Sequence, residues 1–167
     1  MKSEKLNSQT LVRIAMLTAL ATVLTMFPQI PAGNGYIHFG DCIIYLAAIF
    51  LGPIPGAIVG AVGHALADIL SGFAIFAIPT FIIKGLIGFT VGKIVSADNM
   101  TPIRLTLAAL AALVIVTLGY FLAELPLYGI SSAILVFTSS PVQWLMSVAA
   151  SAVLIPLLQK LKGKINL

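Results

Sequence analysis

The sequence has very little charge and almost no cysteine. Of its 167 residues only 8% are charged, whereas 60% are hydrophobic. A soluble fold of this length cannot bury so much apolar surface, so the composition indicates an integral membrane protein. The single cysteine, Cys42, excludes an internal disulfide and a cysteine-based metal cluster. Cys42 is most simply a small packing residue.

Several catalytic motifs are also missing. The stretch "GFTVGKI" lacks the glycine spacing and the Ser/Thr of a phosphate-binding loop, which excludes ATP hydrolysis by this chain. No zinc HExxH motif or GxSxG elbow occurs, and the few carboxylates form no obvious catalytic group in sequence. The basic residues stand singly between apolar runs, without the basic stripe of a nucleic-acid binder. We predict no metal, no cofactor and no nucleic-acid partner.

Long apolar runs predict an all-α, six-helix membrane bundle forming a single domain over residues 1–167, because the "GPIPG" turn is too short for a domain linker. The second span is the weak one, since its purely apolar part, Cys42 to Leu51, reaches only about 15 Å at helical rise. It must be tilted, re-entrant or extended from Tyr36. The six expected spans are about Thr10–Phe27, Tyr36–Leu51, Pro55–Gly72, Ile78–Val95, Ile103–Leu122 and Pro141–Leu161.

The positive charges predict the orientation of this bundle. With six spans, eight of the nine Lys and Arg residues fall on one side, while the connections near residues 28–40, 72–77 and 123–140 contain no Lys or Arg. The positive-inside rule then places both termini in the cytoplasm. The residues on that side are Lys2, Lys5, Arg13, Lys93, Arg104, Lys160, Lys162 and Lys164.

Costly polar side chains gather in the outer half of the bundle. The stretch "IPTFIIKGLIGF" carries Lys84 among apolar residues, about 9 Å below the outer edge of its span at helical rise. Ionisable groups in a bilayer normally face a bundle interior or a wet cavity, so several at one depth predict an outward-opening polar pocket. The others at this level are Asn34, His38, Asp41, His64, Asp68, Tyr120, Glu124, Gln143, Trp144 and Ser147.

Structural interpretations remain open for each of these residues. Lys84 can snorkel to the outer headgroups, and Glu124 can be a solvated loop residue. His64 and Asp68 are spaced i and i+4, so a structural hydrogen bond between them is favoured over a ligand or proton site. Gln143 can cap the start of the last helix. For Tyr36 and Trp144, an aromatic belt and a pocket wall are equally good interpretations.

Small residues mark faces where helices approach closely. Ala15 and Ala19 lie four apart in the cytoplasmic half of the first span. The pairs Gly56 with Gly60 and Gly88 with Gly92 have the same spacing. Such pairs pack a bundle internally or join it to another protein, and the spacing alone does not choose between these roles.

Two quoted stretches carry a resemblance to a known family. "GYIHFGDCIIYLAAIFLGPIPGAIVGAVGHALADILSGF" and "PTFIIKGLIGFTVGK" resemble the substrate-binding S components of energy-coupling factor (ECF) vitamin transporters. The distinctive parts are the His-Phe-Gly-Asp entry to the second span, the Leu-Gly-Pro turn, the Ala-Asp of the third span and the Lys-Gly of the fourth. "GYFLAELPLYG" and the start of the sixth span are similar to the later helices of that family.

The resemblance implies a vitamin-capture protein of a bacterial cytoplasmic membrane. A vitamin would bind in an outward pocket under the loop between the first two helices, and Ala15 and Ala19 would match the docking motif for a membrane coupling (T) subunit. Two ATPase subunits would drive transport, during which the S component topples in the bilayer. The most similar branch is the one for pyridoxine or hydroxymethylpyrimidine, with riboflavin and pantothenate open. Binding roles carry over to Asn34, Lys84, Tyr120, Glu124, Gln143 and Trp144.

Two other functions compete with vitamin capture. A self-sufficient secondary carrier would relay protons through His64 and Asp68, and would accumulate substrate in liposomes without an ATPase. A membrane enzyme would use His64 or Glu124 as an acid or base, and the purified chain would then turn over a substrate.

Overall fold

The chain folds into a helical bundle with one small hairpin. The computed structural model describes the backbone of residues 7–165 and the side chains of residues 7–160, so Lys2, Lys5 and the side chains of Lys162 and Lys164 lie outside the described part. In chain order the elements are α1 (Ser8–Met26), β1 (Ile30–Ala32), β2 (Gly35–Ile37), α2 (Asp41–Leu51), α3 (Pro53–Leu70), the 3-10 helix η1 (Ala74–Phe76), α4 (Ala77–Ile94), α5 (Pro102–Tyr128), α6 (Ile130–Ala133) and α7 (Val136–Ile165).

Five helical segments of the described chain are long and apolar enough to cross a membrane. They correspond to five of the predicted spans, although α5 and α7 are longer than expected. Many large apolar side chains point outward from them, including Ile78 (75% exposed) and Val153 (71% exposed). A surface this apolar is stable in contact with lipid tails. The protein is therefore an integral membrane protein.

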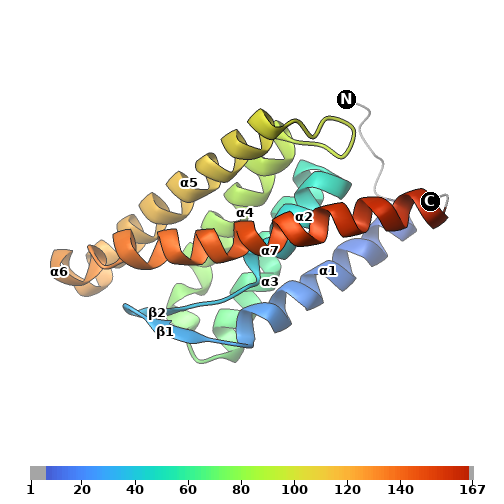
Figure 1. Cartoon of the computed structure of the whole chain (residues 1–167). Coiled ribbons are helices and arrows are strands. Elements are labelled where there is room, and N and C mark those ends of the chain that lie inside the picture. Colours follow the sequence, from blue (N-terminus) through green and yellow to red (C-terminus); the bar gives the residue numbers. More distant parts are fainter. Residues whose placement is uncertain (1–6, 166–167) are drawn as a thin grey trace.

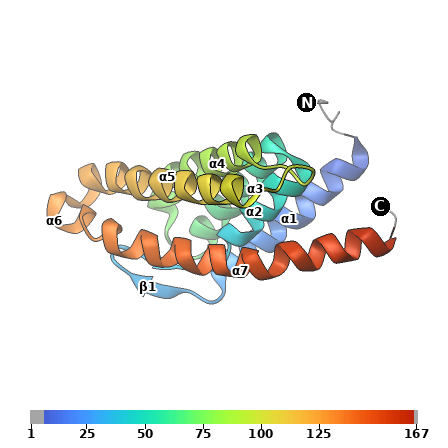
Figure 2. The same cartoon turned by 45° about the horizontal axis from the view of Figure 1, so that its top comes forward.

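The bundle has two ends of different character. The start of α1, the end of α7 and the α4–α5 connection lie at one end, which we call the terminal end (Figures 1 and 2). The hairpin of β1 and β2, together with α6, lies at the other, which we call the hairpin end. The two strands are antiparallel and pair Ile30 with Ile37, across a turn that contains Gly33 at φ +59°. The connection between α1 and α2 thus contains a β-hairpin, which the sequence analysis did not predict.

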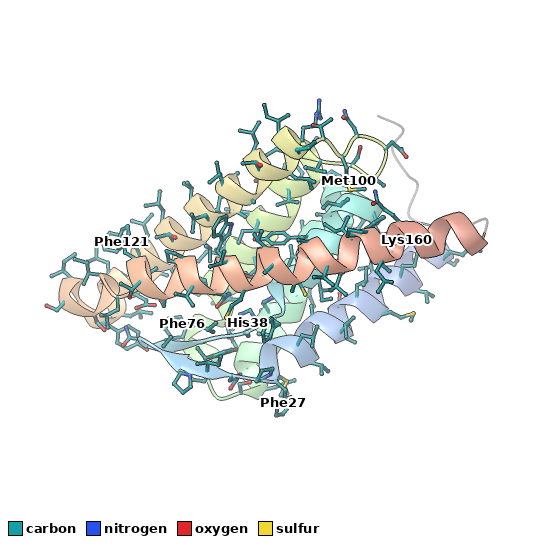
Figure 3. All side chains as sticks on the ribbon, viewed as in Figure 1. Phe27, His38, Phe76, Met100, Phe121 and Lys160 are labelled. Carbon is teal, nitrogen blue, oxygen red and sulfur yellow. The ribbon has the colours of Figure 1, made fainter. Side chains whose placement is uncertain are left out.

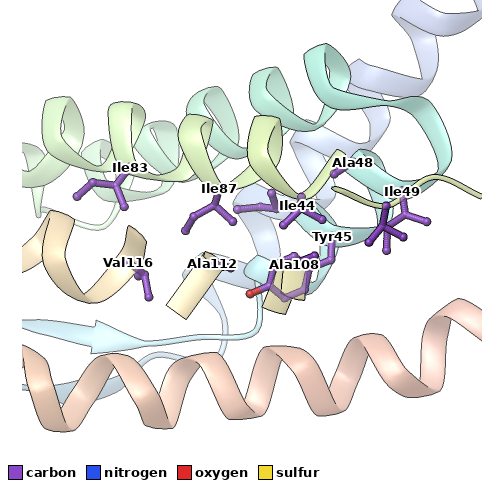
Figure 4. Close-up of a cluster of buried hydrophobic side chains, with 11 residues drawn as sticks. Ile44, Tyr45, Ala48, Ile49, Ile83, Ile87, Ala108, Ala112 and Val116 are labelled. Carbon is purple, nitrogen blue, oxygen red and sulfur yellow. The ribbon is translucent and has the colours of Figure 1, made fainter. Parts of the chain in front are cut away.

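Helix α2 is a short helix in the centre of the bundle. The prediction that the second span begins at Tyr36 is wrong, because Tyr36 lies in β2 and the helix begins at Asp41. Every residue from Asp41 to Ile49 is buried, as expected for a helix that is apolar all round. Ile44, Tyr45 and Ala48 pack against side chains of α4 and α5 (Figure 4). Since its neighbours shield it from lipid on all sides, α2 does not need the length of a full span.

Glycines bring α3 and α4 into backbone contact. A Cβ atom on Gly60 would collide with the backbone carbonyl of Lys84, and one on Gly88 would collide with the backbone of Gly56. The absence of side chains at these positions lets the two helices approach closely. The small-residue pairs on α3 and α4 therefore pack the bundle internally, which settles one alternative that the spacing left open.

Candidate ligand-binding site

A cavity of about 70 Å³ lies at the hairpin end, between the hairpin and the ends of α3, α4, α5 and α7. His38 and Phe76, which line it, lie near the hairpin, whereas Met100 and Lys160 lie at the terminal end (Figure 3). Its walls combine aromatic rings, hydroxyls, an amide and two carboxylates. The lining residues are Ala32, Gly35, Tyr36, Ile37, His38, Asp68, Phe73, Phe76, Thr80, Val116, Tyr120, Glu124, Val136, Ser139, Ser140 and Gln143.

Two side chains of the hairpin bond to carboxylates on the helices. The Tyr36 hydroxyl donates to Oδ1 of Asp68 at 2.7 Å, and the Asn34 amide donates to Oε2 of Glu124 at 2.7 Å. Asn34 also exchanges hydrogen bonds with the Ser132 hydroxyl. Burial and the neighbouring Asp68 raise the pKa of Tyr36 well above its usual range, so its hydroxyl keeps its proton. These bonds hold the hairpin over the cavity.

An ion pair lies in the centre of the bundle, beside the cavity. Lys84 is fully buried, and its Nζ donates to both carboxylate oxygens of Asp41 at 2.7 Å. Asp41 is the first residue of α2, where the helix dipole also favours a negative charge. Lys84 is therefore neutralised inside the protein by a residue 43 positions away in sequence. It is absent from the lining of the cavity.

Gln143 connects this ion pair to the cavity wall. Its side-chain amide nitrogen lies 3.0 Å from Oδ2 of Asp41 and 3.2 Å from Nε2 of His38. An ionised carboxylate only accepts hydrogen bonds, so the amide must turn its NH₂ group toward Asp41. Its Oε1 makes no hydrogen bond with the described residues. Gln143 is therefore available to a ligand in the cavity as a hydrogen-bond acceptor, through Oε1.

His38, Asp41 and His64 are close enough together to suggest a metal site. Their potential ligand atoms lie within 4.8 Å of one another. Nε2 of His64 lies 3.1 Å from Oδ1 of Asp41, and the other ring nitrogen, Nδ1, lies 3.0 Å from the Gly60 carbonyl. The ammonium of Lys84 already occupies the position of a cation next to Asp41. The trio is thus better suited to an internal ion pair than to a metal ion.

Comparisons with known proteins show the family of this chain. Residues 5–163 match the family "ECF-type riboflavin transporter, S component". The chain belongs to this family. It is therefore a substrate-binding component of a transporter, and the family resemblance seen in the motifs is confirmed.

Individual proteins are similar to this S component over different lengths. A Pyrococcus woesei protein described as "Uncharacterized protein in gap 3'region" is 38% identical over 73% of this chain and 82% of its own. A UPF0397 protein of Clostridium perfringens is 33% identical over 55% of this chain, which spans half of that protein. A crystal structure of FolT bound with folic acid superposes with a TM-score of 0.71 at 21% identity, over 89% of this chain and 93% of that one. This last likeness shows a shared fold.

The structure brings together four of the six residues predicted to bind a ligand in this S component. Tyr120, Glu124 and Gln143 line the cavity, and Asn34 bonds to Glu124 next to it. Lys84 is bound to Asp41 behind the wall. Trp144 faces α5 and donates its indole N–H to the Ala109 carbonyl at 2.7 Å. A ligand contact of Lys84 or Trp144 stays a prediction to which this cavity adds no support.

Several structural interpretations of single residues are wrong. Lys84 cannot snorkel, because it is fully buried against Asp41, and Glu124 is only 7% exposed, so it is no solvated loop residue. Gln143 does not cap the last helix, because α7 begins seven positions earlier at Val136.

The predicted hydrogen bond between His64 and Asp68 is also absent. His64 turns toward Asp41, and Asp68 instead accepts from Tyr36. The two residues share a helical face, but different neighbouring elements supply their partners. A proton relay through this pair therefore lacks its predicted contact.

The sequence did not reveal the partners of two carboxylates. The sequence places Asp41 and Asp68 at the level of the predicted pocket, but it does not pair Asp41 with Lys84, and it favours His64 as the partner of Asp68. Opposite charges at similar predicted depth, Lys84 and Asp41, were the signal available for the first pair. No pattern in the sequence points from Asp68 to Tyr36, because the hairpin determines that contact.

Two further surfaces lie away from this cavity. Ala15 and Ala19 are both exposed on α1, so the face predicted to dock a partner is free of contacts from the described chain. A second cavity of about 130 Å³ lies between α2, α4, α5 and α7, and its lining is almost entirely apolar, including Ile49, Val91, Ala108, Val148 and Ile155.

Proposed function

We propose that this S component captures a water-soluble vitamin from outside the cell and delivers it inward as part of an ECF transporter. The cavity at the hairpin end would then face outward and both termini would lie in the cytoplasm. The described Lys and Arg residues support this orientation. Arg13, Lys93, Arg104 and Lys160 lie near helix ends at the terminal end, and Lys84 is the one described basic residue toward the hairpin end.

The charges of the cavity indicate the class of vitamin. Asp68 and Glu124 line the cavity, whereas no Lys or Arg is among its lining residues. Lys84 is neutralised by Asp41 and is not available to pair with a bound anion. A carboxylated vitamin such as pantothenate or folate would bring a further negative charge next to these carboxylates, at a cost in free energy. A neutral or cationic ring fits better.

Within that class we propose pyridoxine or hydroxymethylpyrimidine as the substrate. Each is a single ring with hydroxyl or amino donors, which match the acceptor-rich wall of the cavity. Riboflavin, to which the name of the family refers, is also neutral but has three fused rings. In our proposal Tyr120 stacks on the ring, while Glu124 and the Gln143 carbonyl accept hydrogen bonds from it. Asn34 holds Glu124 and closes the hairpin over the ligand.

The observation that carries this proposal is a cavity whose described lining contains two carboxylates and no Lys or Arg. We would titrate the purified chain in detergent with pyridoxine, hydroxymethylpyrimidine, riboflavin, pantothenate and folate by calorimetry. Tight binding of a neutral or cationic ring, without binding of pantothenate or folate, is expected. Preferred binding of an anionic vitamin would refute the substrate class, and no binding of any of the five would refute the proposal of vitamin capture.

The transport partners form a separate part of the proposal. Ala15 and Ala19 would contact the T subunit, which two ATPase subunits drive, since small exposed residues four apart let another helix approach closely. The double variant Ala15→Trp with Ala19→Trp should lose co-purification with the T subunit and keep its vitamin affinity. Leu11→Trp, on an exposed residue one turn earlier in α1, is the matched control. An unchanged yield of complex with the double variant would contradict this docking surface.

A further inference from the structure

We propose that Asp68 recognises a nitrogen-bearing edge of the bound vitamin, accepting a hydrogen bond from a ring N–H or an amino group. This inference rests on the proposed function and names the contact that selects the substrate. It concerns a residue that the sequence pattern assigned to a structural pair with His64. The starting observation is that Asp68 lines the cavity and has an unused carboxylate oxygen.

The carboxylate of Asp68 is only half satisfied. The side chain is 6% exposed, and its Oδ1 accepts from the Tyr36 hydroxyl at 2.7 Å. Its Oδ2 is buried and has no hydrogen-bond partner among the described residues. Buried polar atoms are paired in nearly all native proteins, so an exception calls for a partner from elsewhere. A ligand in the adjoining cavity is the one source that the proposed function supplies.

Among the described residues, none forms an ion pair with this carboxylate. The ammonium of Lys84 is bonded to both oxygens of Asp41, and the Nε2 atom of His64 also lies beside Asp41. Thr80 lies next to Asp68, and its hydroxyl, which shares a 3.0 Å hydrogen bond with Tyr120, is the neutral donor on this side. A single neutral hydroxyl does not replace a cation. Asp68 therefore remains a strong acceptor for a donor that enters the cavity.

Gln143 gives the same wall a second free acceptor. Because its NH₂ group is held by Asp41, its Oε1 is left for the cavity. Two acceptors, one of them a carboxylate, favour a ring that presents two donors, one of them attached to nitrogen. Protonated pyridoxine has a ring N–H and hydroxyls, and hydroxymethylpyrimidine has an amino group and a hydroxyl. Both satisfy this pattern.

The test is a comparison of ligands with and without the nitrogen donor. We would titrate the purified full chain with pyridoxine and with its carbocyclic analogue, in which CH replaces the ring nitrogen. Hydroxymethylpyrimidine would be compared with its desamino analogue, and riboflavin with its N3-methyl derivative. The variants are Asp68→Asn, which keeps the acceptor for Tyr36, and Tyr36→Phe, which removes that bond and keeps the carboxylate. Thermal unfolding checks that each variant is folded.

We expect the wild-type chain to bind the natural member of one pair about tenfold to a hundredfold more tightly than its analogue. Asp68→Asn should bind that vitamin more weakly by a similar factor and should no longer distinguish the two ligands. Tyr36→Phe should still distinguish them.

Other outcomes overturn the inference. If Asp68→Asn binds and discriminates like the wild type, Asp68 does not recognise the ligand, although vitamin capture stands. If both variants weaken both ligands equally, Asp68 serves only to hold the hairpin. Wild-type binding of pantothenate or folate alone also overturns it, and binding of none of the vitamins overturns the proposed function with it.

Discussion

Two buried carboxylates of the bundle, Asp41 and Asp68, have very different partners. Asp41, 3% exposed, is surrounded by donors, since Lys84 bonds to both of its oxygens and Gln143 bonds to one. Asp68, 6% exposed, receives one bond from Tyr36 and forms no ion pair with a described residue. The first carboxylate is closed off within the bundle, and the second adjoins a cavity.

This difference suits a buried carboxylate to one of two roles, connecting helices or binding a ligand. A buried charge with a complete set of partners connects elements, here α2, α4 and α7, because each partner must be in place to offset its desolvation. A buried charge with an incomplete set is costly in the empty protein and becomes stabilised when a ligand completes it. We therefore expect Asp41 to determine stability and Asp68 to determine affinity.

The largest effect is expected from removing the ion pair between Lys84 and Asp41. Lys84→Met removes the cation and leaves the Asp41 carboxylate buried without it, so the free energy of unfolding should fall by about 3 to 5 kcal/mol. Unfolding of the purified protein in mixed micelles with increasing dodecyl sulfate would measure this. The double variant Asp41→Asn with Lys84→Met removes both charges and should recover part of the loss. A Lys84→Met protein as stable as the wild type would show that the ion pair does not hold the bundle together.

A slightly smaller effect is expected from separating the helices that carry both regions. Helix α3 contributes Asp68, and α4 contributes Thr80, which lies next to Asp68, and Lys84, which binds Asp41. The close packing of these two helices therefore positions neighbours of both carboxylates. Gly88→Ala inserts a methyl group against the backbone of Gly56 and should cost about 1 to 3 kcal/mol of stability. Gly85→Ala, where the new atom comes within 3.3 Å of the Ala61 side chain and 3.7 Å of the Ala57 carbonyl, should cost less. Equal costs for the two variants would contradict the close α3–α4 contact.

Residues of the cavity wall should affect vitamin affinity rather than the stability of the protein. Glu124→Gln keeps the shape of the side chain and removes a charge from the cavity wall, so vitamin affinity should fall about tenfold, or about 1.4 kcal/mol. Asp98→Asn removes the same charge from an exposed position in the α4–α5 connection and should leave affinity unchanged. Calorimetry on both variants measures the difference. An equal loss for both would mean that overall charge, not the cavity, governs binding.

The smallest effect on stability is expected for Asp68→Asn, in contrast to the large loss expected for Lys84→Met. Asp68→Asn removes a carboxylate that has no cation and retains the acceptor for Tyr36, so the stability of the ligand-free protein should stay within about 1 kcal/mol of the wild type. The same unfolding titration, run without vitamin, measures it. A loss as large as that of Lys84→Met would show that Asp68 is as much a part of the fold as Asp41, and the contrast between the two carboxylates would disappear.

The sequence predicted the main features of the fold because they depend on local patterns. Apolar runs located five membrane-spanning segments to within a few residues at most boundaries, since a lipid environment requires about 20 apolar residues per helix. The level of the cavity was also predicted, because costly polar residues at one depth imply a wet or ligand-filled space. The pattern failed where elements do not cross the membrane, as in the hairpin and the short helix α2.

The pairing of the polar residues was the part that local patterns could not supply. Helical spacing suggested His64 with Asp68, which lie on one face of α3, but each found a partner on another element. The same applies to Lys84, whose span contains no acid and whose partner comes from α2.

By itself, the sequence determined that this chain is a membrane protein, where its helices lie and which polar residues share a depth. These features follow from the hydrophobicity and length of continuous segments of the chain. Only the tertiary structure decided that Lys84 neutralises Asp41, that Gln143 turns its oxygen to the cavity and that Asp68 keeps an unused acceptor. Those outcomes depend on distances of about 3 Å between elements far apart in sequence, and charge and hydrogen-bond energies are decided at that range.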